Sequence, residues 1–296
     1  MVSSLTERIQ KFISEKAQVL TNAGIERSKG EVETILCHLL NCERLDLYMR
    51  GMELITDEVR ERFEAIIERR LTRYPIQYIL EESWFYGRRF FVSPAVMVPT
   101  PETELLCETA IRYVQQRKIK RPRILDIGVG SGVISVTMAL ELAEPEIVAL
   151  DISKDALAVA EKNAADLGAE NQIEFRQSDF FGAVTPAELF DLILSNPPYI
   201  NDTEYETLPP EVLADPKISL TSGPDGLDAV RQILIRAPEH LTPNGRLIFE
   251  IGYDQAEQVA LLTETDDRYK SIAILKDYND CDRLVILSCG GRTDAS

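Results

Sequence analysis

Residues 190–200 read Phe-Asp-Leu-Ile-Leu-Ser-Asn-Pro-Pro-Tyr-Ile. The apolar run at 190–194 predicts a buried parallel strand. Two consecutive prolines cannot continue a sheet, because neither has a backbone N–H and each fixes its own φ. The chain must therefore leave the sheet at Asn196. An extended segment at the carboxyl end of a parallel strand lies where open α/β sheets bind their ligands.

The residues that leave the sheet suit one kind of chemical group. They offer the side-chain amide of Asn196, the backbone carbonyls of Pro197 and Pro198, and the ring of Tyr199. Carbonyl oxygens can accept both hydrogens of a planar NH2 group while the ring stacks on it. The alternative is a simple turn that ends a strand, which Asn-Pro alone most often indicates.

A glycine-rich turn lies upstream, where residues 124–132 read Ile-Leu-Asp-Ile-Gly-Val-Gly-Ser-Gly. Glycines permit a tight turn and let a ligand approach the backbone at a helix start. The dinucleotide fingerprint needs glycine or alanine at position 133, where this chain has Val133. The alternating glycines favour a cofactor whose amino-acid end lies over the turn, with its ammonium held partly by Asp126. A turn without a ligand is the alternative. The candidate cofactor-binding residues here are Asp126, Gly128, Val129, Gly130, Ser131 and Gly132.

Two further acidic residues follow predicted strands. Asp151 ends the second strand, where an acid can bind both hydroxyls of a ribose. It could instead cap the next helix, but Ser153 already suits that role. After the third strand, Asp179 could accept a hydrogen bond from an adenine amino group and Phe180 could pack on the adenine. A solvated loop acid is the alternative for Asp179.

The order of predicted elements gives the domain organisation. Residues 1–74 predict only helices, with a capping box at Ser28–Glu31 and a helix cap at Thr56. Residues 75–100 predict a linker with a β-hairpin that turns near Gly87. Residues 101–296 predict the third domain, which opens with a helix that has Pro101 at its first position. From Arg121 onward strands and helices alternate, which predicts a parallel sheet covered on both faces. The predicted strands are 123–127, 146–150, 172–176, 190–195, 245–251, 271–276 and 283–288, and the helices of this part are 132–142, 153–167, 225–240 and 253–264.

Composition and charge narrow the class of protein. The net charge is −17, from 49 acidic against 32 basic residues, whereas duplex-binding proteins usually carry a basic face. We therefore do not expect nucleic acid as the direct substrate, and a basic protein partner would suit this charge. Five cysteines without a C-x-x-C pair and two histidines predict no metal site. No apolar run is long enough for a membrane span, and Met1–Arg8 lacks the order of a signal peptide, so we expect a cytoplasmic protein.

Together these motifs resemble the class I S-adenosylmethionine-dependent methyltransferases that methylate amino or amide nitrogen. Further segments are similar to the PrmC/HemK family, whose members methylate the side-chain nitrogen of the glutamine in the Gly-Gly-Gln loop of peptide-chain release factors. These segments are Pro75–Ile79, Val98–Glu104, Ser222–Leu227, Phe249–Gln255 and Asp282-Arg283. The resemblance covers residues 75–288, and it implies a seven-stranded Rossmann-like domain behind a small helical substrate-recognition domain.

The resemblance also implies roles for the candidate residues. Asn196, Pro197 and Tyr199 would be catalytic, and these three with Pro198 would bind the substrate. Asn196 would contact S-adenosyl-L-methionine as well, and class I release factors would be the partners. A ribosomal-protein glutamine, or an exocyclic amino group of a nucleic-acid base, is the alternative substrate. The chain departs from the family pattern at Thr100, where arginine is usual, at Glu81, where glycine is usual, and at Ala214-Asp215-Pro216, where Glu-Pro is usual.

Overall fold

The computed structural model describes residues 7–289, so most of the segment used to judge a signal peptide lies outside the described residues. The chain forms two compact units. The first holds the residues up to Glu81 together with Pro210–Ala214, and the second holds Glu82–Pro209 and the residues from Asp215 onward. Within residues 7–289, no helix is long and apolar enough to cross a membrane.

The first unit is helical, as the sequence predicted. Its helices are α1 (Ile9–Asn22), α2 (Ser28–Leu40), α3 (Arg44–Met49), α4 (Asp57–Leu71) and α5 (Ile76–Leu80). Apolar side chains at helical spacing meet in one core, where the rings of Phe12 and Phe63 pack edge to face with centroids 4.8 Å apart. Helices α3 and α5 were not predicted, because six and five residues are too few to show a helical period.

Of the two helix caps predicted in the first unit, one is correct. The side chain of Thr56 accepts a hydrogen bond from the Val59 N–H and begins α4. The predicted capping box at Ser28 is wrong: Ser28 is already helical, and its hydroxyl donates to the carbonyl of Ile25. Glu31, expected to complete that box, instead accepts from the Arg70 guanidinium at 2.7 Å. A charge-assisted bond to a buried arginine is stronger than a cap, so the tertiary contact prevails.

The same arginine binds the separate segment of the first unit. Arg70 is buried, and its Nη1 donates to Glu211 Oε1 at 3.0 Å. Arg73 Nη2 donates to the other oxygen of this carboxylate at 2.9 Å. Residues 210–214 therefore belong to the helical unit through charge-assisted bonds, although they come late in the chain.

The second unit begins with the predicted hairpin, β1 (Glu82–Phe85) and β2 (Arg88–Phe91), which turns at Tyr86-Gly87. Asn163 of helix α8 (Lys154–Leu167) fixes it to the glycine turn: the buried amide accepts from the Phe91 N–H and donates to the carbonyls of Phe91 and Ser131. The hairpin is therefore part of the scaffold around the glycine turn.

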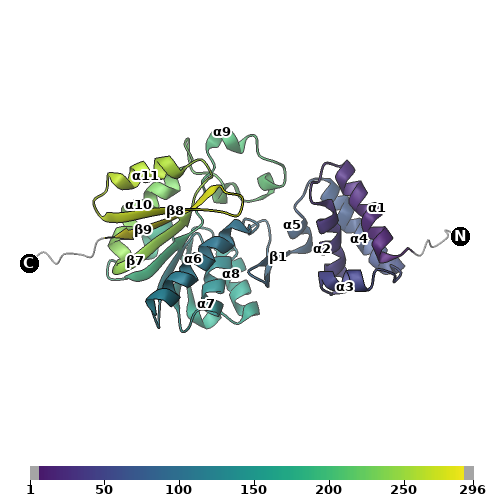
Figure 1. Cartoon of the computed structure of the whole chain (residues 1–296), viewed down its shortest axis with the longest axis horizontal. Coiled ribbons are helices and arrows are strands. Elements are labelled where there is room, and N and C mark those ends of the chain that lie inside the picture. Colours follow the sequence, from purple (N-terminus) through teal and green to yellow (C-terminus); the bar gives the residue numbers. More distant parts are fainter. Residues whose placement is uncertain (1–6, 290–296) are drawn as a thin grey trace, which may run out of the picture. The chain divides into compact units, whose positions relative to one another are not determined.

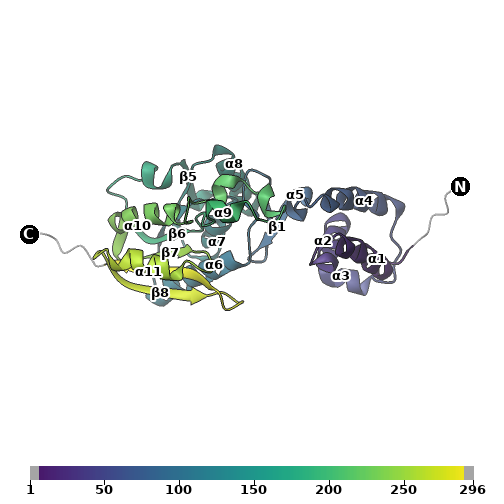
Figure 2. The same cartoon turned by 90° about the horizontal axis from the view of Figure 1, so that it is seen from above.

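A seven-stranded sheet forms the centre of the second unit, and its order is β5-β4-β3-β6-β7-β9-β8. The first five strands in this order run parallel, and β9 and β8 are antiparallel additions. Figure 2 shows β5 and β8 at opposite edges. The strands are β3 (Arg123–Ile127), β4 (Glu146–Asp151), β5 (Ile173–Gln177), β6 (Phe190–Ser195), β7 (Leu241–Glu250), β8 (Tyr269–Lys276) and β9 (Asp282–Cys289).

Helices cover both faces of this sheet. Helices α6 (Glu102–Arg117), α7 (Val133–Glu141) and α8 pack on one face, and α10 (Asp228–His240) and α11 (Ala256–Glu264) pack on the other (Figure 1). Strand β6 alternates accordingly, since Leu192 and Leu194 join the first core and Ile193 joins the second. The predicted fold, a seven-stranded α/β sheet preceded in the chain by a helical region and a hairpin, is confirmed.

The boundaries differ from prediction where turns precede helices. Helix α10 starts at Asp228, three residues later than predicted, because Gly226 with φ 74° forms part of a turn. Helix α11 starts at Ala256, since Gly252–Gln255 forms another turn. Strand β7 starts at Leu241 and is longer than predicted, with an irregular register opposite Phe190–Leu192. Both turns lie beside the candidate site.

Candidate active site

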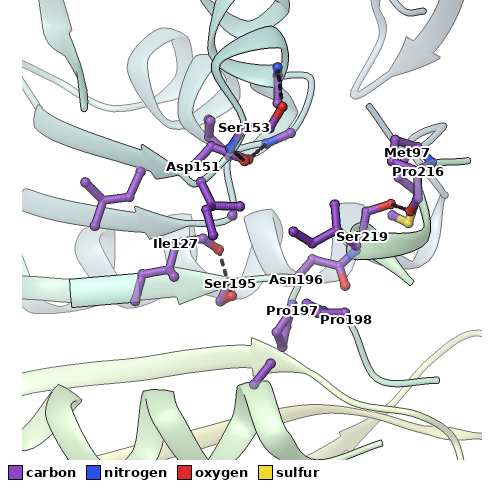
Figure 3. A pocket seen from close by; sticks show the side chains of 18 of the residues that line it. Met97, Ile127, Asp151, Ser153, Ser195, Asn196, Pro197, Pro198, Pro216 and Ser219 are labelled. Atoms are coloured by element: carbon purple, nitrogen blue, oxygen red, sulfur yellow. Dashed lines mark hydrogen bonds between the residues drawn. The ribbon is translucent and has the colours of Figure 1, made fainter. Parts of the chain in front are cut away.

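A cavity of about 410 Å3 opens at the carboxyl ends of β3, β4 and β6. Its wall includes the end residues of these strands, Ile127, Asp151 and Ser195. The strand order reverses between β3 and β6, and open α/β sheets bind ligands at such a point. The Ser195 hydroxyl donates to the carbonyl of Ile127 at 2.8 Å and joins the two strand ends (Figure 3).

The glycine turn forms one wall of the cavity. The N–H groups of Gly128 and Val129 both donate to the carbonyl of Leu150, at 2.8 and 2.9 Å. Gly128, Val129, Gly130 and Ser131 line the cavity, whereas Gly132 does not. Gly132 has φ 85°, and a Cβ there would lie 3.2 Å from the Cα of Ala160, so this glycine lets α8 pack closely. Gly132 therefore has a packing role, although the sequence motif predicts that all five of these residues bind the cofactor.

Asp151 lies at the end of β4 on the cavity wall. Its Oδ2 accepts from the Gly130 N–H at 3.0 Å, and its Oδ1 accepts from the Ser153 N–H at 2.9 Å. Burial raises the pKa of this carboxyl above its ordinary value, and these backbone bonds oppose that shift. Ser153 caps α8 by accepting from the Ala156 N–H, so Asp151 remains available to a ligand.

Asp179 and Phe180 also line the cavity, after β5. Phe180 has φ 43°, which is costly for a residue with a side chain. The Ser178 hydroxyl holds this conformation, because it donates to the Phe180 carbonyl at 2.7 Å and accepts from the Ala183 N–H at 2.9 Å. Strained backbone that its neighbours hold in place is typical of binding sites.

Among the residues that the structure describes, the side chain of Asn196 has one hydrogen-bond partner. Its Nδ2 donates to the hydroxyl of Thr103, from helix α6, at 3.1 Å. The amide nitrogen is therefore engaged, and the carbonyl end Oδ1 is left to act as an acceptor. Asn196, Pro197 and Pro198 all line the cavity, with Met97, Pro216 and Ser219 across from Asp151 (Figure 3).

Unlike the three residues before it, Tyr199 does not line the cavity. Burial raises the pKa of its hydroxyl to about 12. Its backbone carbonyl accepts from Gln255 Nε2 at 2.9 Å, and the same Nε2 donates to the carbonyl of Gly226 at 3.2 Å. A Cβ on Gly226 would lie 2.3 Å from the Tyr199 oxygen, so only glycine permits this approach.

Asp126 lies behind the cavity wall. Its side chain is fully buried, and its Oδ2 accepts from the Ser135 hydroxyl at 2.6 Å. Within residues 7–289, its Oδ1 has no hydrogen-bond partner. Burial raises the pKa of this carboxyl to about 7. Asp126 directly precedes Ile127, which lines the cavity. A buried acceptor without a partner at this position suits a ligand that carries a hydrogen-bond donor.

Four residues at the site were not predicted as functional from sequence. These are Thr103, Asn163, Gly226 and Gln255, which hold Asn196, the glycine turn and the carbonyl of Tyr199. Thr103, Gly226 and Gln255 lie in segments that the family resemblance includes, and this resemblance is the signal that could have indicated them. Their contacts join residues 29 to 93 positions apart, which periodicity cannot detect.

Comparisons with known proteins agree with this geometry. The PrmC N-terminal domain family matches residues 13–80, and the Methyltransferase small domain family matches residues 103–225. A release factor glutamine methyltransferase of Cereibacter sphaeroides is 41% identical over 90% of this chain and 93% of its own length. One of Neisseria gonorrhoeae is 38% identical over 87% of this chain and 92% of its own length.

A solved structure shows the same fold at low identity. A 16S rRNA methyltransferase of T. thermophilus, in complex with AdoMet and guanosine, matches with a TM-score of 0.52 and 18% identity. The match covers 70% of this chain and 49% of that one. The sequence relatives, matched over almost their whole length, identify the family more narrowly, and this chain belongs to the release factor glutamine methyltransferases.

Proposed function

We propose that this protein transfers a methyl group from S-adenosyl-L-methionine to the side-chain amide nitrogen of the glutamine in the Gly-Gly-Gln loop of class I release factors. The observation that carries the proposal is the orientation of Asn196. Its Nδ2 is engaged by Thr103, so its Oδ1 is an acceptor at the wall of a cavity that suits the cofactor. The names of the relatives support the substrate.

The cavity residues fit the cofactor. The Asp151 carboxylate suits ribose hydroxyls, and Asp179 with Phe180 suits adenine. The unpartnered Oδ1 of Asp126 suits the ammonium of the amino-acid end, which lies over the glycine turn in our assignment. When bound, the cofactor supplies an electrophilic methyl group on a sulfonium, so the protein contributes position and electrostatics.

The substrate amide requires two acceptors. An amide nitrogen is a weak nucleophile, since its lone pair is delocalised into the carbonyl. In our proposal Asn196 Oδ1 and the carbonyl of Pro197 accept its two hydrogens. Within residues 7–289, no group donates to that Pro197 carbonyl. These bonds orient the nitrogen and raise its electron density, and alignment of this kind contributes several kcal/mol to lowering a barrier. Tyr199 is proposed to pack on the amide plane, and Pro198 to keep the segment extended.

Charge and organisation suit a protein substrate. The net charge of −17 favours a basic partner and disfavours nucleic acid. We propose that the helical domain, residues 1–74, recognises the release factor, and that the reaction takes place in the cytoplasm.

The test is transfer of labelled methyl from S-adenosylmethionine to purified, unmethylated release factor. A parallel reaction contains the same factor with the loop glutamine changed to alanine. Label in the first reaction alone would support both substrate and site. Absence of label in both, with the cofactor still bound, would contradict the proposal and direct the search to ribosomal proteins and then to nucleic acid.

A further inference from the structure

The buried amide of Asn163 connects the β-hairpin to the glycine turn. Asn163 lies in α8 and is 1% exposed. Its Oδ1 accepts from the Phe91 N–H at 2.7 Å, and its Nδ2 donates to the carbonyls of Phe91 at 2.9 Å and Ser131 at 2.8 Å. Because Phe91 binds the oxygen and one N–H of this amide, the second N–H is directed at Ser131. The hairpin therefore fixes the hydrogen bond that Asn163 makes with the turn.

The backbone N–H groups of the glycine turn show which donors remain for a ligand. Four of the five N–H groups in residues 128–132 donate to the protein itself, to acceptors on Leu150, Asp151 and Val129. Within residues 7–289, neither the N–H nor the hydroxyl of Ser131 has an acceptor. Ser131 lines the cavity and is only 3% exposed. Backbone donors in such a place are almost always satisfied, so we expect a ligand that brings acceptor atoms to Ser131.

The peptide group after Ser131 has a direction that the turn alone would not fix. It lies between Ser131 and Gly132, whose φ is 85°. Glycine adopts many backbone conformations, so the sequence of the turn would allow this peptide group to rotate. The Ser131 carbonyl points away from the cavity, because its partner Asn163 does not line the wall. Rotation would turn that oxygen, with its partial negative charge, toward the cavity.

The next element adds to the preference for a negative group. Helix α7 begins at Val133, directly after the turn, and Val133 also lines the cavity. The N-terminus of a helix carries a partial positive charge that favours an anion. With the Ser131 carbonyl held away, the turn therefore presents donors and a positive helix end to the cavity.

We propose that Asn163 is a positioning residue for a carboxylate: it holds the Ser131 carbonyl away from the cavity, so that the N–H and hydroxyl of Ser131 bind the carboxylate of the cofactor's amino-acid end. This inference rests on the proposed function, because it takes S-adenosyl-L-methionine as the ligand. It adds a partner for the carboxylate, since Asp126 is assigned only to the ammonium. Asn163 itself is not expected to touch the cofactor.

Two ligands separate this role from a general effect on the fold. S-adenosyl-L-homocysteine contains adenosine, sulfur and the complete amino-acid end. Methylthioadenosine contains adenosine and sulfur but has no amino-acid end, and so no carboxylate. Loss of the Asn163 amide should therefore weaken binding of the first ligand only, whereas damage to the whole site would weaken both.

The affinities of the variants are measured by calorimetry. N163L keeps a side chain that branches at the same atom and removes its hydrogen bonds, and N163A removes them without added bulk. Both should raise the Kd of S-adenosyl-L-homocysteine at least about tenfold and that of methylthioadenosine less than about twofold.

Two further variants are the controls. V159A also truncates a buried side chain of α8, but Val159 does not line the cavity, so both Kd values should equal those of the wild type. D151A removes the carboxylate assigned to the ribose, which both ligands contain, so both Kd values should rise by a similar factor.

A second measurement does not require an Asn163 variant to fold. In protein with nitrogen-labelled serine, the backbone amide signal of Ser131 is identified by its absence in S131A. S-adenosyl-L-homocysteine should shift this signal downfield, because its carboxylate accepts from the N–H, and methylthioadenosine should not. If neither N163L nor N163A folds, this signal decides the proposal.

The outcomes distinguish this role from the proposed function. Equal weakening of both ligands in N163L and N163A, or a Ser131 signal that responds equally to both, would overturn the role of Asn163. Selective weakening in these variants, with no methyl transfer from the wild type to release factor, would overturn the proposed substrate and leave this role standing.

Discussion

At the scale of single residues, the orientation of Asn196 is the feature with the most direct chemical meaning. Changing Asn196 to alanine should lower kcat at least about a hundredfold, because an acceptor aligned with the reacting group is lost. The affinity for the cofactor, measured by calorimetry, should change less than about twofold, since Asp151 and the glycine turn remain.

N279A is the control for this change, because Asn279 is exposed and lies outside the cavity. Near-wild-type turnover by N196A would show that Asn196 does not have the role assigned to it.

The backbone conformation of Glu81 should have a measurable effect on the free energy of unfolding. It ends α5 with φ 56°, a left-handed conformation that favours glycine, and the family usually has glycine there. Changing Glu81 to glycine should raise the free energy of unfolding by about 0.5–1 kcal/mol, as measured by urea denaturation. E81A keeps the Cβ and should give no such gain. An equal gain in E81A would attribute the effect to the lost charge instead.

At the scale of elements, the Asn-Pro-Pro-Tyr segment depends on the turns before α10 and α11. An alanine at 226 would place its Cβ 2.3 Å from the carbonyl oxygen of Tyr199. G226A should therefore displace the segment and lower kcat about tenfold or more, with a smaller effect on cofactor affinity.

Gly168 provides the matched control. Its φ is 75°, close to the 74° of Gly226, but a Cβ there would meet no atom within 4 Å. G168A should therefore lose about 1 kcal/mol of stability from backbone strain alone and keep its kcat. If G168A and G226A lowered kcat equally, the contact with Tyr199 would not be the cause.

The sequence predicts some of these elements correctly and others not. The β–α alternation identified every strand of the sheet. The central strands β3, β4 and β6 give the clearest signal, because they are apolar and buried on both faces, whereas the edge strand β8 is mostly exposed. It missed α3, which is short, and misread Ser28, where Glu31 binds Arg70 instead of completing a cap. In the site, it found the groups that lie on the wall, such as Asp151 and Asn196. It could not show the contact of Thr103 with Asn196, because that contact depends on which strands and helices come together.

At the scale of the whole molecule, the fully buried Asp126 affects stability. Its pKa is about 7 in the folded protein against an ordinary 3.8. The folded protein therefore binds more protons than the unfolded chain between these values, so the free energy of unfolding falls as the pH rises through that interval. The expected loss is on the order of 1–4 kcal/mol, since one pKa unit corresponds to about 1.4 kcal/mol.

The variant D126N should reduce this loss, measured by urea denaturation of the cofactor-free protein at about pH 5 and about pH 8. D166N is the control, because Asp166 is exposed and pairs with Lys162 on the surface of α8. An unchanged pH dependence in D126N would show that Asp126 does not hold its proton in the folded state.

The bond from Gln255 to the carbonyl of Tyr199 has a consequence for the newly made chain. The two residues are 56 positions apart, and Gln255 is the later one. At a synthesis rate of roughly 5–20 residues per second, the ribosome needs about 3–11 s to add the residues between them. During that interval the nascent chain already contains Asn-Pro-Pro-Tyr, but nothing yet holds its carbonyl. If the proposed function is correct, methyl transfer should therefore begin only when translation has passed well beyond the Asn-Pro-Pro-Tyr motif.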